Sequence, residues 1–334
     1  MAGAVVIVGP NESGSASGTP DTAGLRIGNG SLACVEVLGQ TVLGRTVEQL
    51  LRGGIESLAV VAKDSFASAV LGEDRVTFSS AADVWQSAGE KIASMTADSF
   101  LVMRLGAYVE FDPADLLETH RNLQMPLTRA CSDAGPLDLW AMSPAAISSS
   151  GDLKQILQNG EGGSYPVRGY VNRLESPRDL RQLVCDALGA RCQFRPHGLE
   201  VKPGVWMGQG AQLERSARIV APAFIGRNCK VGDQCLITRG SNIESNSEVD
   251  YGTVVEDSSV LSNTYVGIGL DLSHSIVDGD NLLNLQHEVT LKITDPVVLR
   301  HVRSSKFRPA KDGSFLANLG VSDVAMPSLP DEQQ

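Results

Sequence analysis

One feature of the chain limits its fold more than any other: an aliphatic residue recurs at every sixth position of the C-terminal half. Two residues before each of these anchors the side chain is small, and Val205 is the exception. An α-helix cannot use this period, because its repeat of about 3.6 residues would carry the anchors around the helix surface. The period is typical of a parallel β-helix, in which short strands stack and the anchors fill the interior. The anchors are Met207, Leu213, Ile219, Ile225, Val231, Ile237, Ile243, Val249, Val255 and Leu261.

The same pattern predicts where the coil ends. Three hexads per turn give about three turns between Val205 and Thr264. The period breaks at residues 265–270, and the apolar residues after the break, Ile276, Val277, Leu282 and Leu283, keep no six-residue phase. We therefore expect the regular coil to end there and a capping segment to follow. Residues 326–334 are polar and contain proline, so we expect them to fray.

The N-terminal half has the pattern of an α/β domain. Short apolar runs at residues 5–8, 58–62 and 100–103 predict strands that are buried on both faces. Helical spacing follows at residues 47–52, 81–93 and 113–122, the last with Asp112 as the expected N-cap. Alternation of strand and helix predicts a mostly parallel sheet in three layers. We expect an α/β domain over residues 1–198, a β-helix over 199–290 and an extension over 291–334.

Composition narrows the class of partner. The 334 residues carry a net charge of -11, which disfavours general binding to nucleic acid or to an anionic membrane. The longest apolar stretches are far shorter than the roughly 20 residues that span a bilayer, and the first ten residues lack a signal-peptide pattern. We expect a cytoplasmic protein. Six scattered cysteines without a CxxC motif predict reduced thiols rather than a zinc site.

Four stretches resemble the sugar-1-phosphate nucleotidyltransferases, in particular the mannose-1-phosphate guanylyltransferase and glucose-1-phosphate nucleotidyltransferase type. They are residues 37–55 (VLGQTVLGRTVEQLLRGGI), 100–121 (FLVMRLGAYVEFDPADLLETHR), 169–180 (GYVNRLESPRDL) and 202–220 (KPGVWMGQGAQLERSARIV). The resemblance covers most of the chain and holds in order. It implies a Rossmann-like nucleotidyltransferase domain followed by a left-handed parallel β-helix of hexapeptide repeats.

The resemblance also implies a reaction, in which a sugar phosphate displaces pyrophosphate from an NTP. That chemistry requires a glycine-rich loop with a basic residue, and acidic side chains that hold Mg²⁺. Where the family has GxGTRLxPLT, this chain has GPNESGSAS at residues 9–17, with Glu12 and with no arginine. Backbone amides of this loop are the candidates for binding nucleotide phosphates, and they belong to Gly9, Ser13, Gly14 and Ser15.

The residues that carry the family's chemistry are absent. Alignment places Leu32 where the family has its substrate-binding lysine, and Gly106 and Arg173 where it has its two metal-binding aspartates. A shift of one residue would match the second aspartate to Asn172 instead. With both carboxylates gone, nothing obvious organises Mg²⁺, so we expect no cofactor unless the protein is an active enzyme with a rearranged site.

Other polar side chains have plainer interpretations. An N-cap and a solvated helix face explain the acidic residues Asp112, Asp115 and Glu118. His120 matches a histidine of the family's helix and is expected to be structural. His274 and His287 are expected to be surface or capping residues, and the alternative is that one of them is a general base for acyl transfer. Trp206 is expected to fill the junction between the α/β domain and the coil.

Three functions follow from these observations. The leading hypothesis is a nucleotidyltransferase-like protein without turnover, acting as a regulatory or scaffolding subunit in sugar-nucleotide or cell-surface polysaccharide biosynthesis. The first alternative is an active sugar-1-phosphate nucleotidyltransferase, and the second is a coenzyme A-dependent acyltransferase working from the coil. An NTP or an NDP-sugar is the expected ligand. Apolar residues after Tyr265 predict a homo-oligomer, or a hetero-oligomer with an active relative.

Overall fold

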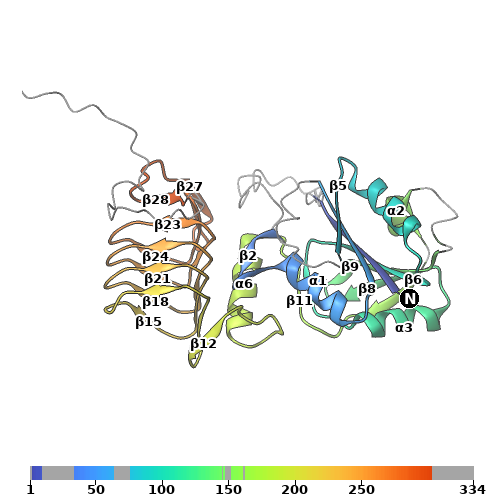
Figure 1. The fold of residues 1–334 in the computed structure, drawn as a ribbon, viewed down its shortest axis with the longest axis horizontal. Coiled ribbons are helices and arrows are strands. Elements are labelled where there is room, and N and C mark those ends of the chain that lie inside the picture. Colours follow the sequence, from blue (N-terminus) through green and yellow to red (C-terminus); the bar gives the residue numbers. More distant parts are fainter. Residues whose placement is uncertain are drawn as a thin grey trace, which may run out of the picture. The chain divides into compact units, whose positions relative to one another are not determined.

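A seven-stranded sheet forms the centre of the N-terminal half (Figure 1). The computed structural model describes residues 2–9, 34–63, 76–144, 146, 152–160 and 162–302. Strands follow one another across the sheet in the order β10-β8-β9-β6-β1-β4-β5. Four of the six pairings are parallel, and β9 is antiparallel to both of its neighbours. The strands are β1 (Ala2–Val8), β4 (Ser57–Ala62), β5 (Val76–Ser80), β6 (Ser99–Arg104), β8 (Leu127–Ser132), β9 (Gly135–Met142) and β10 (Gly163–Pro166).

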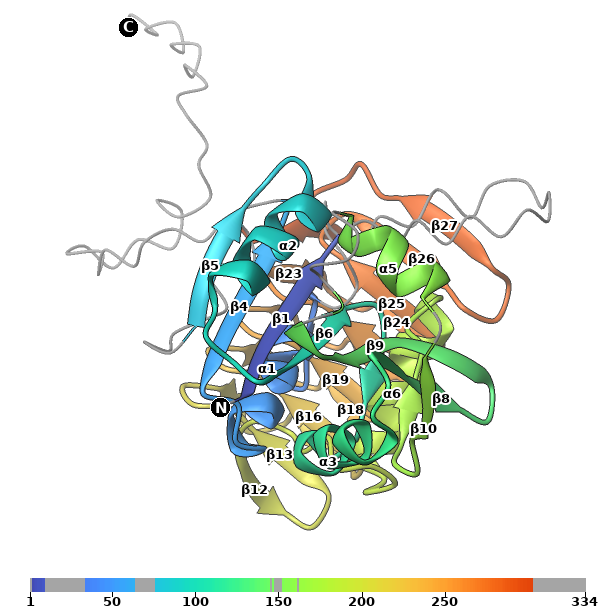
Figure 2. The same cartoon turned by 90° about the vertical axis from the view of Figure 1, so that its right-hand side faces the viewer.

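Helices cover both faces of this sheet, which confirms the predicted α/β character. The helices are α1 (Val42–Arg52), α2 (Val84–Ser94), α3 (Pro113–Leu123), α5 (Leu153–Asn159) and α6 (Pro177–Leu188). Apolar side chains of α1, α3 and α6 pack in one core cluster with Val6, and those of α2 and α5 pack in a second cluster with Ile7. Alternate residues of β1 thus face different helices. Figure 2 shows α2 lying against the sheet at β1 and β4. The predicted N-cap Asp112 accepts a hydrogen bond from the amide of Ala114 at 2.9 Å. No helix in the described part of the chain is long and apolar enough to cross a bilayer.

Three stacks of short parallel strands follow in the C-terminal half and form a three-sided coil (Figure 1). Each strand pairs with the strand of the same side one turn later, as Ile225 pairs with Ile243. The first side contains β13 (Val205–Met207), β16 (Ala223–Ile225), β19 (Ser241–Ile243), β22 (Ser259–Val260) and β25 (Ser275–Asp278). The second contains β14 (Gln212–Leu213), β17 (Lys230–Val231), β20 (Glu248–Val249) and β23 (Thr264–Val266). The third contains β15 (Arg218–Ile219), β18 (Leu236–Thr238), β21 (Val254–Glu256) and β24 (Asp271–Ser273).

Small polar residues before the anchors connect one turn of the coil to the next. The Ser247 hydroxyl donates to the Leu261 carbonyl at 2.8 Å and accepts from the Thr264 amide at 3.1 Å. Thr253 does the same with the Gly267 carbonyl and the Leu270 amide. A buried backbone group left without a partner is costly, and each hydroxyl satisfies two such groups at a corner of the coil. This explains why the residue two positions before an anchor has a small side chain, which is often serine or threonine.

The stacking changes by one residue at Val260. Ile225 and Ile243 are 18 residues apart, whereas Ile243 pairs with Val260, only 17 residues on. Val260 therefore packs in the coil interior, and Leu261 belongs to the core cluster of the α/β half. The predicted anchor at Leu261 is wrong by one residue. Either Val260 or Leu261 could serve as the inward anchor, because each has a serine two residues before it. Burial of Leu261 against the α/β core selects the register in which Val260 points inward.

The coil also continues beyond the predicted break at residues 265–270, so that prediction is wrong. Val266, Leu272 and Val277 fill the interior, and their strands pair in parallel with the preceding turn. Antiparallel strands end the stack: β26 (Asn281–Asn284) follows β25, β27 (Val289–Lys292) follows β26, and β28 (Leu299–His301) pairs with β23. Leu299 is 2% exposed and closes the interior.

The coil and the α/β half share one hydrophobic core. Outward-facing coil residues Phe224, Leu261, Ile276 and Leu283 belong to the same cluster as Val6 of β1. Trp206, expected at the junction, is partly buried against this cluster. Residues 1–302 form one compact unit. The domain boundaries at residues 198 and 290 stay predictions.

A buried carboxylate strengthens the same junction. Glu244 of the coil has no exposed surface, and its side chain accepts hydrogen bonds from the Leu38 amide at 2.7 Å and the Gly39 amide at 2.9 Å. These amides form the turn between β2 (Glu36–Val37) and β3 (Gln40–Thr41). Glu36 in turn accepts hydrogen bonds from the hydroxyls of Ser245 and Ser262. The turn that leads into α1 is therefore held by the coil.

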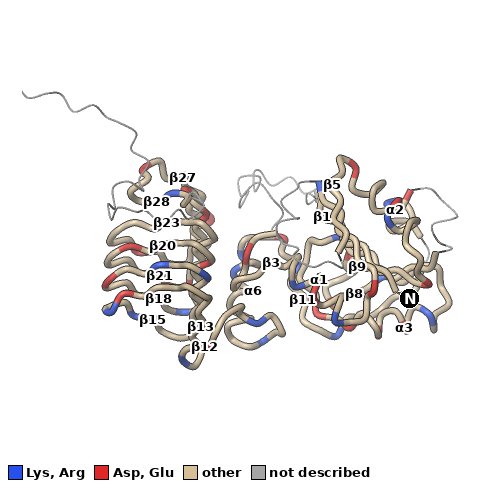
Figure 3. The backbone as a smooth tube through the Cα atoms, viewed as in Figure 1, with Lys and Arg blue, Asp and Glu red and all other residues tan. Residues whose placement is uncertain are grey.

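Short two-stranded and edge strands complete the fold. They are β7 (Tyr108–Val109), β11 (Val171–Asn172), which pairs antiparallel with β7, and β12 (Leu199–Lys202), which pairs antiparallel with β13. Acidic and basic residues occur on both the α/β half and the coil (Figure 3).

Candidate functional site

The topology of the sheet points to one place for a ligand. The chain runs outward from β1 through β4 to β5, and then returns to place β6 on the other side of β1. In open α/β sheets ligands bind outside the carboxyl ends of the strands where the strand order reverses. Here that point lies between β1 and β6. Gly9 directly follows β1, so the structure places this predicted nucleotide-binding residue at the reversal point.

The N-terminus of α2 lies beside Gly9. A Cβ atom on Gly9 would be 3.9 Å from Val84 Cγ2, in the first turn of α2. Asp83 caps the helix and accepts hydrogen bonds from the amides of Trp85 at 3.0 Å and Gln86 at 3.1 Å. A helix N-terminus carries a partial positive charge that favours an anion. Gly9 itself brings no side chain to this end of β1.

Arg104 is the last residue of β6, in register with Ile7 of β1. Its Nε donates to Asp138 Oδ2 at 2.7 Å, and its Nη2 donates to the same oxygen. Arg129 Nη2 donates to the other oxygen of Asp138 at 3.1 Å, and its Nε donates to the Leu137 carbonyl at 2.9 Å. One carboxylate therefore holds two guanidinium groups, and the group of three side chains has a net charge of about one positive unit. We refer to Arg104 and Arg129 as the arginine pair.

Alternation along the strands places the arginine pair on the face covered by α2. Ile7, Val102 and Trp140 pack in the cluster that contains the apolar side of α2, and Arg104 alternates in phase with Val102. The Arg129 guanidinium carbon lies 5.2 Å from the centre of the Trp140 ring. Both arginines keep about a third of their side-chain surface exposed, at 29% and 35%. The pair is held in place and still open to solvent.

Gly106 and Arg173, the two positions where the resembled family has its aspartates, both lie in the described part of the chain. Gly106 follows β6 and carries no side chain. Arg173 follows β11, with Nη1 3.8 Å from Glu175 Oε1 and with Nη2 buried and without a hydrogen-bond partner among the described residues. Asn172, the alternative alignment, donates to the Asp179 carbonyl and accepts from the Leu174 amide, so its side chain is used within the fold.

The remaining predicted positions of the loop, Ser13, Gly14, Ser15 and Leu32, lie outside the described residues. Sequence reasoning missed Arg104, Arg129 and Asp138. Two signals could have found them: a charge that ends the apolar run FLVMR, and an aspartate at the centre of the strand GPLDLWAM.

Mg²⁺ does not fit the residues at the reversal point. Over the described ranges, no three side chains of His, Cys, Asp or Glu gather closely enough to hold a metal. Asp138 is the acid beside the arginine pair, and both of its oxygens accept from guanidinium groups. Gly106 supplies no oxygen ligand, and Arg173 brings a positive charge. The six cysteines, all within the described residues, form no disulfide.

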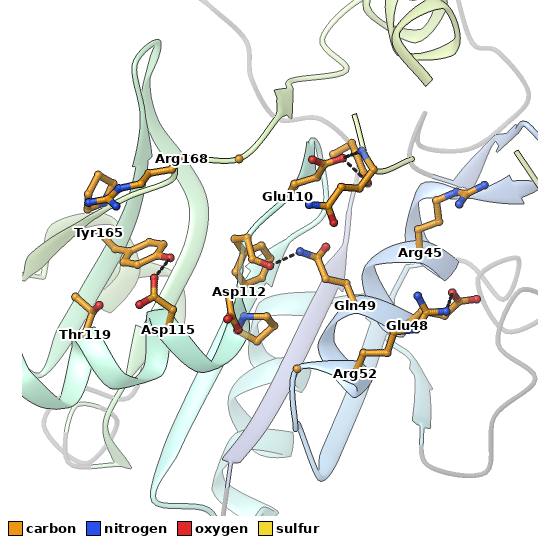
Figure 4. A pocket seen from close by; sticks show the side chains of 17 residues that line it. Arg45, Glu48, Gln49, Arg52, Glu110, Asp112, Asp115, Thr119, Tyr165 and Arg168 are labelled. Atoms are coloured by element: carbon orange, nitrogen blue, oxygen red, sulfur yellow. Dashed lines mark hydrogen bonds and ion pairs between the residues drawn. The ribbon is translucent and has the colours of Figure 1, made fainter. Parts of the chain in front are cut away.

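A separate pocket of about 750 Å³ lies between α1, the segment from β7 to α3, and residues 165–169 (Figure 4). Gln49 donates to the Phe111 carbonyl at 2.6 Å, and the Tyr165 hydroxyl donates to Asp115 at 2.6 Å. Burial and the bond to Asp115 raise the pKa of Tyr165. The pocket contains both signs of charge, with Arg45 and Arg168 as well as the acids.

Three histidines singled out from the sequence are not brought together. His120 is buried, with Nδ1 2.8 Å from the Thr128 hydroxyl and Nε2 3.0 Å from the Ser143 hydroxyl, and burial lowers its pKa. His274 lies at a corner of the coil with Nδ1 2.6 Å from Asp257. His287 is exposed. Glu118 is exposed on α3, as expected for a solvated helix face.

No known family model matches the chain, and no curated protein matches its sequence. Among solved structures the chain is similar to HddC from Yersinia pseudotuberculosis, with 16% identity and a TM-score of 0.43 over 55% of this chain and 97% of HddC. A structure of the same protein complexed with GMP-PN matches with 14% identity and a TM-score of 0.42, over the same shares of both chains. At these identities the similarity concerns the fold alone.

Proposed function

We propose that the protein is a nucleotidyltransferase-like subunit that binds a nucleotide or NDP-sugar and does not turn it over. It would act as a regulatory or scaffolding subunit in sugar-nucleotide or cell-surface polysaccharide biosynthesis. The observation that carries the proposal is the set of residues at the carboxyl ends of β1 and β6. Gly9 and Arg104 lie there with Arg129 of β8 close to Arg104, and Asp138, the described carboxylate beside the two arginines, has both oxygens bound by guanidinium groups.

Electrostatics favours binding over transfer at this site. Transfer of a nucleotidyl group brings the negative charges of an NTP and a sugar phosphate together, and acidic ligands must hold the Mg²⁺ that offsets them. Gly106 and Arg173 replace both acids that the resemblance predicts. The arginine pair still attracts phosphate oxygens. The site can therefore bind an anion without the means to place the metal.

The coil supplies the scaffolding half of the proposal. Its parallel sheets present long faces, and Phe224, Leu261 and Ile276 on one side of it pack in the core of the α/β half. We propose that the coil is a left-handed parallel β-helix of hexapeptide repeats, and that it joins a homo-oligomer or a hetero-oligomer with an active relative.

Turnover is tested directly by pyrophosphate release. With Mg²⁺, each NTP, and mannose-1-phosphate or glucose-1-phosphate, the purified protein should release no pyrophosphate above the level of buffer. Steady NDP-sugar production by the pure protein would overturn the proposal in favour of an active nucleotidyltransferase with a rearranged site. An active relative assayed in the same buffer serves as the positive control.

Assembly is tested by light scattering. We expect a mass of at least twice the 35.4 kDa of one chain, either alone or after addition of an active relative from the same cell. A monomer at micromolar concentration that stays a monomer with that relative would remove the scaffolding role and leave only ligand binding.

A further inference from the structure

The two arginines at the end of the sheet raise a question that the proposed function leaves open: which part of the ligand they recognise. Each uses Nε and Nη2 on protein acceptors, and among the described residues neither Nη1 group has a partner. These two groups are not buried. Each therefore keeps donors for an acceptor that comes from outside.

The geometry restricts the kind of acceptor. Asp138 binds both guanidinium groups through its two oxygens, so the groups are held near each other and cannot separate without breaking a charged hydrogen bond. Arg129 is further oriented by the Leu137 carbonyl and by Trp140. Two fixed guanidinium groups with one shared counter-charge match a phosphate or diphosphate, which offers several anionic oxygens. A carboxylate or a neutral sugar would satisfy only part of these donors.

The position of the arginine pair in the fold further restricts the kind of acceptor that it can bind. Arg104 is adjacent to the end of β1 in the sheet register, and Gly9 at that end is in contact distance of the first turn of α2. The arginine pair, the open glycine and the helix N-terminus all lie on the α2 face of the sheet. The arginine pair thus supplies a positive charge at this end of the sheet, and Gly9 brings no side chain that would fill the space beside it.

We propose that Arg104 and Arg129 bind the phosphate groups of a nucleoside diphosphate sugar directly, without a divalent cation. Asp138 holds the two guanidinium groups in place and balances one of their charges when the site is empty. This inference rests on the proposed function for the nucleoside and sugar parts of the ligand. The phosphate recognition itself depends only on the arginine pair.

Isothermal titration calorimetry with UDP-glucose, GDP-mannose and inorganic pyrophosphate, each in EDTA and in Mg²⁺, tests the proposal. We expect the wild type to bind at least one NDP-sugar equally well in both buffers. Arg104→Gln and Arg129→Gln should each raise its dissociation constant by about tenfold or more, the usual effect of losing a charged hydrogen bond. Arg104→Lys and Arg129→Lys should retain part of the affinity, since they keep the charge and lose the planar fork.

The matched control is Arg52→Gln on α1, whose side chain is 81% exposed and pairs with Glu48 away from the site. It should leave the affinity unchanged. The lysine variants also guard against misfolding of the glutamine variants, because they keep a partner for Asp138. Binding of pyrophosphate alone would identify free phosphate compounds as the natural source of the anion.

The outcomes separate the two proposals. If no nucleotide or NDP-sugar binds to the wild type but pyrophosphate binds through the arginine pair, the proposed function fails and the phosphate site stands. If an NDP-sugar binds and the glutamine variants bind it as well as the wild type, the phosphate site is wrong and the proposed function stands. Binding that requires Mg²⁺ would also overturn metal-free recognition.

Discussion

A buried side chain at the junction of the α/β half and the coil, Glu244, makes the stability of the protein depend on pH. Burial, and the negative charge of Glu36 nearby, raise the pKa of its carboxyl group from 4.5 to about 8. Hydrogen bonds from the Gly39 amide, the Asn242 side chain and the Leu38 amide oppose this shift of the pKa without cancelling it. The folded protein therefore holds a proton on Glu244 over a pH range in which the unfolded chain has lost it.

The consequence is a loss of stability as the pH rises. A carboxyl group whose pKa is raised by folding stabilises the native state below its unfolded pKa, and the contribution disappears as the pH passes the folded pKa. Between pH 5.5 and 7.5 this group alone should lower the free energy of unfolding by roughly 1.4 kcal/mol per pH unit. Glu244→Gln cannot titrate and should lose that slope. Urea denaturation of both proteins across this range measures it, and equal slopes would show that Glu244 does not titrate there.

The site residues show what a sequence can and cannot predict at this scale. Gly9 was predictable because a glycine after a buried strand is typical of a phosphate-binding turn. Charges within apolar strands mark Arg104 and Asp138 one by one, but the meeting of Arg104, Arg129 and Asp138 was not predictable, because it depends on the antiparallel pairing of β9 with β6 and β8. That residues 104 and 138 are adjacent can be seen only when the order of the strands in the sheet is known. The resemblance, in turn, points to Gly106 and Arg173 and not to these residues.

Among the elements, the coil depends most on which side chains point inward. Ile237 has no exposed surface, whereas Leu236 beside it in β18 is partly exposed. Ile237→Asp should cost about 3 to 5 kcal/mol, since it buries a charge without a partner. Leu236→Asp, the matched control, should cost less than about 1 kcal/mol. Thermal unfolding of both variants compares them, and similar melting temperatures would mean that the strand faces are assigned wrongly.

The repeat was predictable because its period comes from local geometry: each strand, turn and anchor recurs within six residues. The shift to Val260 was not, because neighbouring positions there are equally suitable for the interior. The continuation of the coil through Val266 and Leu272 was hidden by the same shift, which moves the anchors out of the original phase, and a second shift of one residue places Val277 in the interior. The packing of Leu261 against the α/β core decides which of the two residues points into the coil, a choice that the sequence pattern leaves open.

At the scale of the whole molecule, the shared core predicts that the two halves unfold together. Phe224 of β16 is fully buried in the cluster that contains β1 and α6, so Phe224→Ala should cost about 3 to 5 kcal/mol. Hydrogen exchange should show amides of β1 and of β19 losing protection by similar amounts, because one cooperative unit contains both. Loss of protection confined to the coil would show two units that unfold independently.

We propose that the site at the carboxyl end of the sheet binds the phosphates of an NDP-sugar and does not exchange them. Phosphorus NMR of GDP-mannose with pyrophosphate, Mg²⁺ and the protein reports both properties in one sample. We predict that the two diphosphate resonances shift or broaden on addition of protein, that Arg104→Gln weakens this change at the same concentrations, and that no NTP resonance appears. Growth of NTP signals would show an active nucleotidyltransferase, and unchanged diphosphate resonances would show that the site does not bind the ligand at all.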